Sequence, residues 1–141
     1  KNSKDFYGLA SGGIGWAVSG CIGVSLANTN KTIVAIIGDG SSMYAIQSIW
    51  TAAHYNLPII YVIANNQSYR IIKERLEGFH NNTNFVGMDF NKPKIDFVKL
   101  GNSMGVESKQ VSEPTELKSL FKKAFKYKKP YLIEVMVDKG Y

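Results

Sequence analysis

Two short polar segments each follow an apolar run in this sequence. Gly38-Asp39-Gly40-Ser41 comes after TIVAII, and Asn65-Asn66-Gln67-Ser68 comes after IIYVIA. The two glycines of the first segment allow a sharp turn and a close approach of the backbone to a ligand. Ser41 and the N–H groups of a following helix could bind a phosphate there. Asp39 would repel that phosphate unless a cation lay between the two.

Magnesium is the cation that fits this arrangement. Mg²⁺ takes oxygen ligands, and proteins usually hold it with one or two carboxylates together with phosphate oxygens of the ligand. Asp39, the amide oxygen of Asn66 and a backbone carbonyl near Ser68 would supply such a set. Each segment taken alone is also a common turn. Because both follow successive strands, and the carboxyl ends of parallel strands meet in one crevice, we predict a shared diphosphate and metal site.

Other phosphate and metal motifs do not fit. The chain has no GxxxxGK[ST] segment, and Gly13-Ile14-Gly15 lacks the third glycine and the preceding strand of a dinucleotide fingerprint. A calcium loop is excluded because no oxygen ligands follow Asp39 at alternating positions.

The elements that would position these segments alternate between apolar runs and helical patterns. This alternation predicts an α/β fold: a three-layer, doubly wound, mostly parallel sheet with helices on both faces. The expected strands are 33–37, 59–65, 131–137 and a weaker one at 105–111. The expected helices are 11–27, 42–55 and 112–128.

Two of these helices carry an apolar stripe. In 42–55 the stripe is Tyr44, Ile46, Ile49, Trp50 and Ala53. Helix 112–128 has Ser112 as its expected N-cap and a stripe with the spacing of a core-facing helix. That stripe is Leu117, Leu120, Phe121, Ala124 and Phe125. Residues 78–94 have neither helical nor strand periodicity and predict a long loop, which in a compact domain is usually functional or mobile.

Composition limits the classes further. The chain has 141 residues, 45% of them hydrophobic, which fits a single domain over 1–141. One cysteine excludes an internal disulfide and favours a reducing, cytoplasmic setting, and no apolar run is long enough to cross a membrane. The net charge of +6 comes largely from lysines in 118–129, so we expect no nucleic-acid partner. The first residue is Lys1 rather than Met, which suggests a fragment of a larger multidomain enzyme.

The quoted segments, read together with their surroundings, resemble a known family. GGIGWAV, GDGSSMYAIQSIWTAAHYNLPIIYVIANNQSY, GMDF and KPYLIEV are similar to the C-terminal, diphosphate-binding domain of thiamine-diphosphate (ThDP) enzymes. The nearest group is that of acetolactate synthase and benzoylformate decarboxylase, and IWTAAHYNLP resembles the second branch most. The opening strand and helix of that domain have no counterpart here.

The resemblance implies the cofactors ThDP and Mg²⁺ and a role for each matching residue. Mg²⁺ would be bound by the side chains of Asp39 and Asn66 and by the main-chain oxygen of Ser68. The Gly12 carbonyl would accept a hydrogen bond from the 4′-amino group of the cofactor, and Ile14 would hold the cofactor in its bent form, unless Ile14 is plain core. The full expected cofactor-binding set is Gly12, Ile14, Gly38, Gly40, Ser41, Ser42, Asn66, Ser68 and Tyr69.

Catalysis would need more than this chain. The family activates its cofactor with a glutamate on a separate pyrimidine-binding domain, of the same or a neighbouring subunit, and no segment here matches that domain. We therefore expect no catalytic residue in the fragment. Glutamates with no such context are Glu74, Glu77, Glu107, Glu113, Glu116 and Glu134.

The resemblance also marks a substrate side. Ile71, Ile72 and Arg75 would lie there, on a helix that begins after Asn66. Ile72 replaces the glutamate of pyruvate decarboxylases, which argues against that branch. Arg75 could bind an anionic substrate or simply be solvated. His54 is expected on a helix surface and His80 in a loop.

Two functions remain open at this stage. The first is a ThDP/Mg²⁺ domain of a 2-oxo acid decarboxylase or an acetolactate-synthase-like carboligase, acting in a homodimer or homotetramer on a small 2-oxo acid. The second is a non-catalytic module that binds ThDP or another diphosphate.

Overall fold

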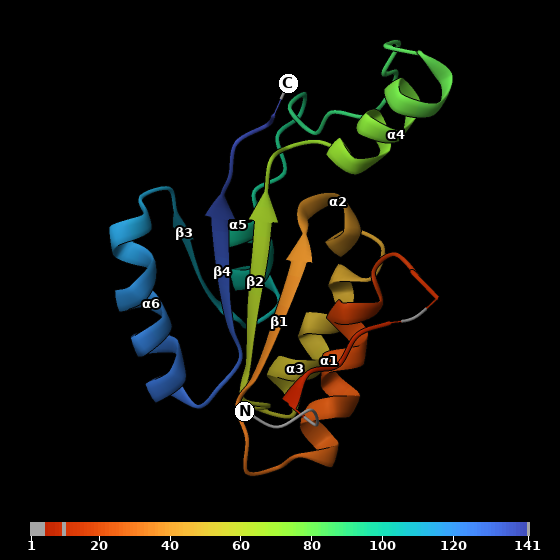
Figure 1. Ribbon diagram of the computed structural model, residues 1–141. Helices are drawn as coiled ribbons and strands as arrows, with labels where there is room; N and C mark the ends of the chain where they lie inside the picture. Colours follow the sequence, from red (N-terminus) through yellow and green to blue (C-terminus); the bar gives the residue numbers. More distant parts are fainter. Residues whose placement is uncertain (1–4, 10, 141) are drawn as a thin grey trace.

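The computed structural model describes residues 5–9 and 11–140, and its centre is a four-stranded parallel sheet (Figure 1). The strand order is β1-β2-β4-β3, and every neighbouring pair is parallel. The strands are β1 (Ile33–Gly38), β2 (Ile59–Asn65), β3 (Glu107–Val111) and β4 (Tyr131–Met136). All four predicted strands are therefore present, with their ends shifted by at most two residues.

Helices cover both faces of this sheet, as predicted. Three helices pack on one face, where a core forms around Ile59, Tyr61 and Ile63 of β2. One helix packs on the other face, against Ile60 and Val62. The helices of the first face are α1 (Trp16–Ala27), α3 (Ile49–His54) and α5 (Phe97–Ser103), and that of the second is α6 (Pro114–Tyr127). The central strand β2 is buried on both faces, which explains its unbroken apolar sequence.

The predicted helix 42–55 is not continuous. The chain forms a short helix α2 (Asp39–Ser42), then a turn, then the 3₁₀ helix η2 (Ile46–Ser48) and α3. Ala45 leaves the helical region at φ −147°, where residues 44 and 45 pass directly over the backbone of Gly15. Within the expected stripe, Ile46 and Ile49 are buried, whereas Tyr44 and Trp50 are more than half exposed.

The other helices differ from prediction at their ends. The first starts at Trp16 rather than residue 11, because Gly12 and Gly15 adopt positive φ angles that end helical structure. The cap of α6 is Glu113 rather than Ser112, and Pro114 occupies the first turn, where its missing N–H costs no hydrogen bond. Phe125 is the stripe residue that stays exposed.

Helix α4 (Arg70–His80) lies beyond the carboxyl ends of β1 and β2, at the top of Figure 1. It matches the helix expected after Asn66, and the loop predicted over 78–94 runs instead from residue 81 to residue 96. His80 is accordingly the last helical residue rather than a loop residue. Helix α5 was not predicted, because only Phe97, Val98 and Leu100 mark it within seven residues.

Candidate functional site

The two polar segments meet at the carboxyl ends of β1 and β2. Gly38 of β1 pairs in register with Ala64 of β2, so Asp39 and Asn65 leave the sheet side by side. A cleft of about 520 Å³ opens there. Its lining includes ten of the sequence-predicted site residues: Ile14, Gly38, Asp39, Gly40, Ser41, Asn66, Ser68, Tyr69 and the substrate-side Ile71 and Ile72.

Asp39 and Asn66 converge on a single atom. The main-chain N–H of Ser68 donates to Asp39 Oδ2 at 3.2 Å and to Asn66 Oδ1 at 3.0 Å. The other Asp39 oxygen accepts from the N–H of Gly40 at 2.8 Å. The carboxylate and the amide oxygen therefore lie close together, each within 3.2 Å of the Ser68 nitrogen, and their remaining lone pairs could bind one cation.

Burial makes the Asp39 carboxylate unusual. It is only 4% exposed, and burial raises its pKa, while main-chain N–H groups of Gly40, Gln67 and Ser68 oppose that shift. No ion pair with a cationic side chain is found for Asp39 among the described residues, and a buried carboxylate with only N–H donors is poorly neutralised. A bound metal ion would supply the missing positive charge.

Asn65 and Asn66 have different partners, although they are adjacent and identical. The Asn65 amide donates to Glu134 Oε1 at 2.6 Å, and its oxygen accepts from the Gln67 N–H at 2.9 Å. Asn65 is thus fully engaged in shaping the turn, which holds Gln67 at a positive φ of 59°. Asn66 lines the cleft instead.

Glu134 is a residue whose role the sequence reasoning missed. It is 1% exposed in the middle of β4, and its second oxygen accepts from Gln110 at 3.1 Å. An acidic residue inside an otherwise apolar strand was the signal, because such a group needs buried donors. Here those donors support the turn that carries the site.

The GGIG segment reaches the same turn from α1. The Gly15 N–H donates to the Ser41 hydroxyl at 3.0 Å. Gly15 has a φ of +85°, and a Cβ there would lie 2.7 Å from Cβ of Tyr44. This close approach leaves Ile14 53% exposed and facing the cleft, so plain core is the wrong description for Ile14.

Gly38 and Gly40 serve different purposes. Gly38 has an ordinary φ of −72°, and a Cβ there would meet nothing in the protein, so the turn itself does not require glycine at this position. A Cβ on Gly40 would lie 2.5 Å from the Tyr69 ring and 3.0 Å from Phe90. Those two rings pack edge to face at 4.5 Å over the turn.

Three predicted residues do not line the cleft. Gly12 is exposed in the turn before Ile14, and Arg75 is exposed farther along α4. Ser42 is fully buried, and its hydroxyl donates to the Asp39 main-chain oxygen at 2.7 Å. The N–H of Gly40 is likewise used within the turn, so it is not one of the free donors expected for a phosphate.

His54 is exposed and stacks on Trp50, as expected for a surface residue.

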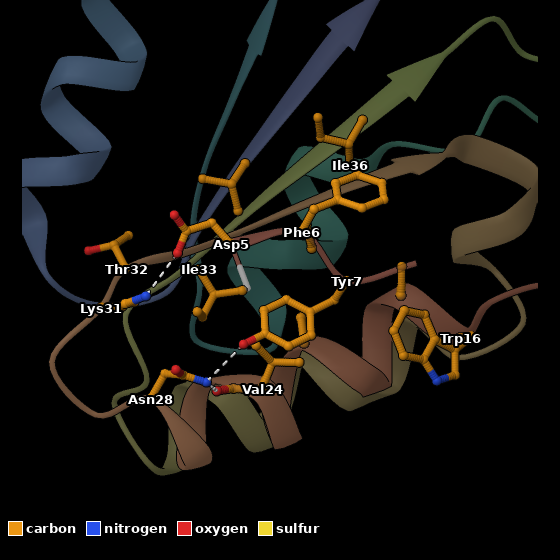
Figure 2. A pocket seen from close by; sticks show the side chains of 14 residues that line it. Asp5, Phe6, Tyr7, Trp16, Val24, Asn28, Lys31, Thr32, Ile33 and Ile36 are labelled. Atoms are coloured by element: carbon orange, nitrogen blue, oxygen red, sulfur yellow. Dashed lines mark hydrogen bonds and ion pairs between the residues drawn. The ribbon is translucent and has the colours of Figure 1, made fainter. Parts of the chain in front are cut away.

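A second cavity, of about 500 Å³, lies along the length of β1 rather than at its carboxyl end. Figure 2 shows its lining: Phe6 and Tyr7 stand over β1 and α1, and Asp5 pairs with Lys31 at 2.9 Å. Ile36 of β1 is 73% exposed there, although α6 covers the equivalent face of β2. This cavity carries none of the predicted site residues.

In the described part of the chain no three His, Cys, Asp or Glu side chains gather as a metal cluster, and no helix is long and apolar enough to cross a membrane. The predicted metal set has one carboxylate, so it depends on amide and main-chain oxygens instead.

Comparison with known proteins addresses the family directly. The family described as "Thiamine pyrophosphate enzyme, C-terminal TPP binding domain" matches residues 4–135. The chain belongs to this family. As a TPP-binding domain it resembles a putative acetolactate synthase large subunit, IlvX, of Mycobacterium tuberculosis, at 30% identity over 96% of this chain and 27% of that protein. It is 32% identical to benzoylformate decarboxylase of Pseudomonas aeruginosa over 92% of this chain and 24% of that protein.

Solved structures agree with both the family and the fold. The 4-hydroxybenzoylformate decarboxylase of Rhodococcus jostii RHA1, described as thiamine diphosphate-dependent, superposes with a TM-score of 0.85 at 34% identity. The match covers 92% of this chain and 24% of that one. Benzoylformate decarboxylase from Polynucleobacter necessarius gives a TM-score of 0.83 at 33% identity, over 95% of this chain and 25% of that one. The chain thus spans about a quarter of the length of the relatives it matches.

Proposed function

We propose that this TPP-binding domain anchors the diphosphate of ThDP through Mg²⁺ held by Asp39, Asn66 and the main-chain oxygen of Ser68. The observation that carries the proposal is the convergence of Asp39 Oδ2 and Asn66 Oδ1 on the Ser68 N–H. Mg²⁺ prefers such oxygen ligands and keeps positions for phosphate oxygens and water.

The cleft around the metal set would bind the rest of the cofactor. Gly38, Gly40 and Ser41 line the cleft at the turn, where the diphosphate would bind, and the exposed Ile14 offers an apolar surface to the rings. When bound, ThDP supplies the electron sink for cleaving or forming a bond next to a carbonyl. The protein residues orient the cofactor and, through Ile14, Ile71 and Ile72, keep water away from it.

We further propose that the domain works within a longer 2-oxo acid decarboxylase or acetolactate-synthase-like carboligase. The activating glutamate would come from a pyrimidine-binding domain of the same or a neighbouring subunit, in a cytoplasmic homodimer or homotetramer. The activities of the relatives support this class, and Ile71 and Ile72 at the cleft suit a small apolar 2-oxo acid.

Mn²⁺ as a paramagnetic substitute for Mg²⁺ tests the anchoring. We expect thiamine diphosphate to tighten Mn²⁺ binding to the chain, measured by electron paramagnetic resonance, while thiamine monophosphate does so much less. Equal effects of the two compounds would overturn the proposed bridge. Assays of the polypeptide that carries this domain, with pyruvate and with benzoylformate, test the reaction class; turnover of neither would remove both assignments.

A non-catalytic ThDP-binding module is the second candidate. Arg75 is exposed and does not line the cleft. It therefore does not place a positive charge on the predicted substrate side. Tight ThDP binding together with inactivity toward 2-oxo acids would favour this candidate.

A further inference from the structure

Helix α4 buries a lysine. Lys73 is 6% exposed, although its helical neighbours Arg70 and Glu74 lie at the surface. Its Nζ lies 2.7 Å from Asp89 Oδ1 and 5.3 Å from the centre of the Phe85 ring. Lysine is seldom buried unless it is paired, so the ion pair with Asp89 is what stabilises Lys73 in its buried position.

The ion pair joins α4 to a segment that supports the metal turn. The Tyr69 N–H donates to the Met88 oxygen at 2.9 Å, and the Phe90 N–H donates to the Gln67 oxygen at 2.8 Å. These two bonds flank an isolated antiparallel bridge in which Ser68 stands opposite Asp89. The Ser68 hydroxyl adds a bond to the Met88 oxygen at 3.1 Å.

This pattern fixes the direction of the Ser68 main chain. In an antiparallel pair flanked in this way, the residue at the centre turns its own N–H and C=O away from the partner strand. The Ser68 N–H accordingly points to Asp39 and Asn66. Its carbonyl oxygen, the third ligand in the proposed metal set, is directed by the same bridge.

The Lys73–Asp89 pair adds a charge interaction to the hydrogen bonds and the Tyr69–Phe90 ring contact that hold the bridge. Ser68 and Asp89 form a single pair outside any sheet. Asp89 lies in the segment from residue 81 to residue 96, which contains no helix and no strand. The Lys73–Asp89 pair attaches this segment to a helix by a partly desolvated charge interaction, which is stronger than a fully exposed pair.

We propose that the Lys73–Asp89 ion pair is a positioning element for the metal site, which holds the Ser68 carbonyl where Mg²⁺ rather than a larger cation is preferred. Mg²⁺ demands near-ideal octahedral geometry, whereas Ca²⁺ accepts longer and more variable ligand distances. Loosening the Ser68 turn should therefore weaken Mg²⁺ binding more than Ca²⁺ binding. The inference rests on the proposed function, because it assumes that the cation binds at this set.

The test uses Lys73→Met, which keeps the length of the side chain and removes its charge. ThDP affinity is measured by calorimetry at saturating Mg²⁺ and at saturating Ca²⁺, and melting temperature is followed in parallel. The matched control is Lys123→Met, which breaks the Lys123–Glu107 pair of 2.6 Å between α6 and β3, away from the cleft. Asp89→Asn breaks the same pair from the loop side and serves if Lys73→Met does not fold.

We expect Lys73→Met and Asp89→Asn to lower ThDP affinity about tenfold in Mg²⁺, corresponding to about 1.4 kcal/mol, and much less in Ca²⁺. Lys123→Met should leave the ratio of the two affinities unchanged. A purely structural role for Lys73 would lower the melting temperature without changing that ratio, and this result would overturn the inference. Metal-independent ThDP binding by the unmodified chain would instead refute the proposed function, so the two failures are distinguishable.

Discussion

The effect of Gly40→Ala can be predicted in detail, because the structure shows which atoms the added methyl group would meet. An ideal Cβ at residue 40 lies 2.5 and 2.7 Å from two carbons of the Tyr69 ring and 3.0 Å from Phe90. Ordinary contacts of this kind are longer than 3.4 Å, so the Tyr69 ring would have to move by about 1 Å. Phe90 packs edge to face against that ring and resists the movement. Overpacking of this kind costs about 1–3 kcal/mol.

The cost should appear in both stability and binding. At about 4 °C per kcal/mol for a chain of this size, we expect the melting temperature to fall by about 4–12 °C. ThDP affinity in the presence of Mg²⁺ should fall as well, because Tyr69 and Gly40 both line the cleft. Thermal denaturation followed by circular dichroism, together with calorimetry, measures the two effects.

A matched glycine supplies the control. Gly23 lies inside α1, has no atom within 4 Å of its ideal Cβ, and is exposed. Gly23→Ala should therefore stabilise the chain by about 0.5–1 kcal/mol through helix propensity. In a Tyr69→Ala background most of the Gly40→Ala penalty should disappear. A Gly40→Ala variant as stable as the parent chain would show that the ring packing over the turn is not as described.

Three further predictions follow from burial and close packing. Ile36→Ser, at a side chain that is 73% exposed, should change the free energy of unfolding by less than about 1 kcal/mol. Ile37→Ser, at 5% exposure, should lower the free energy of unfolding by about 3 kcal/mol or more. Similar losses for the two variants in urea titrations would contradict the exposure of this face of β1. Burial raises the pKa of the Cys21 thiol to about 11, so at pH 8 only about a thousandth is thiolate. Labelling by a disulfide reagent should then be slow until denaturant is added, and rapid labelling of the native chain would refute the placement. Gly15→Ala should destabilise the chain by about 1–3 kcal/mol and weaken ThDP binding, because a Cβ there meets Tyr44 at a φ of +85°; unchanged melting and binding would show that the loop over Ser41 is free to adjust.

The fold could be predicted where the local signal and the tertiary requirement agree. The strand 59–65 matches β2 residue for residue, because it is buried on both faces and its sequence is apolar throughout. The helix 42–55 was predicted as continuous, since its apolar spacing is helical. Its break at Ala45 lies where the chain packs against Gly15, thirty residues earlier in the sequence, and no local pattern carries that contact.

The candidate site, like the fold, could be predicted only in part from the sequence. Asp39 and Asn66 could be found because each follows a recognisable strand and carries a metal-ligand oxygen. The supporting residues Lys73, Asp89 and Glu134 could not be assigned, since their partners lie 16 residues or more away and are joined only by the folded chain. Nor could the sequence distinguish Ser41, which lines the cleft, from Ser42, which is buried beneath it.

The central claim is that a metal ion joins the diphosphate to Asp39 and Asn66. Its most direct test is calorimetry of ThDP with and without Mg²⁺, on the parent chain and on Asp39→Asn, which retains the side-chain shape and removes its charge. We expect Mg²⁺ to strengthen ThDP binding at least tenfold in the parent chain, equivalent to about 1.4 kcal/mol, and most of this gain to be lost in Asp39→Asn. Binding that is indifferent to Mg²⁺, or a metal effect that survives the loss of the carboxylate, would contradict it.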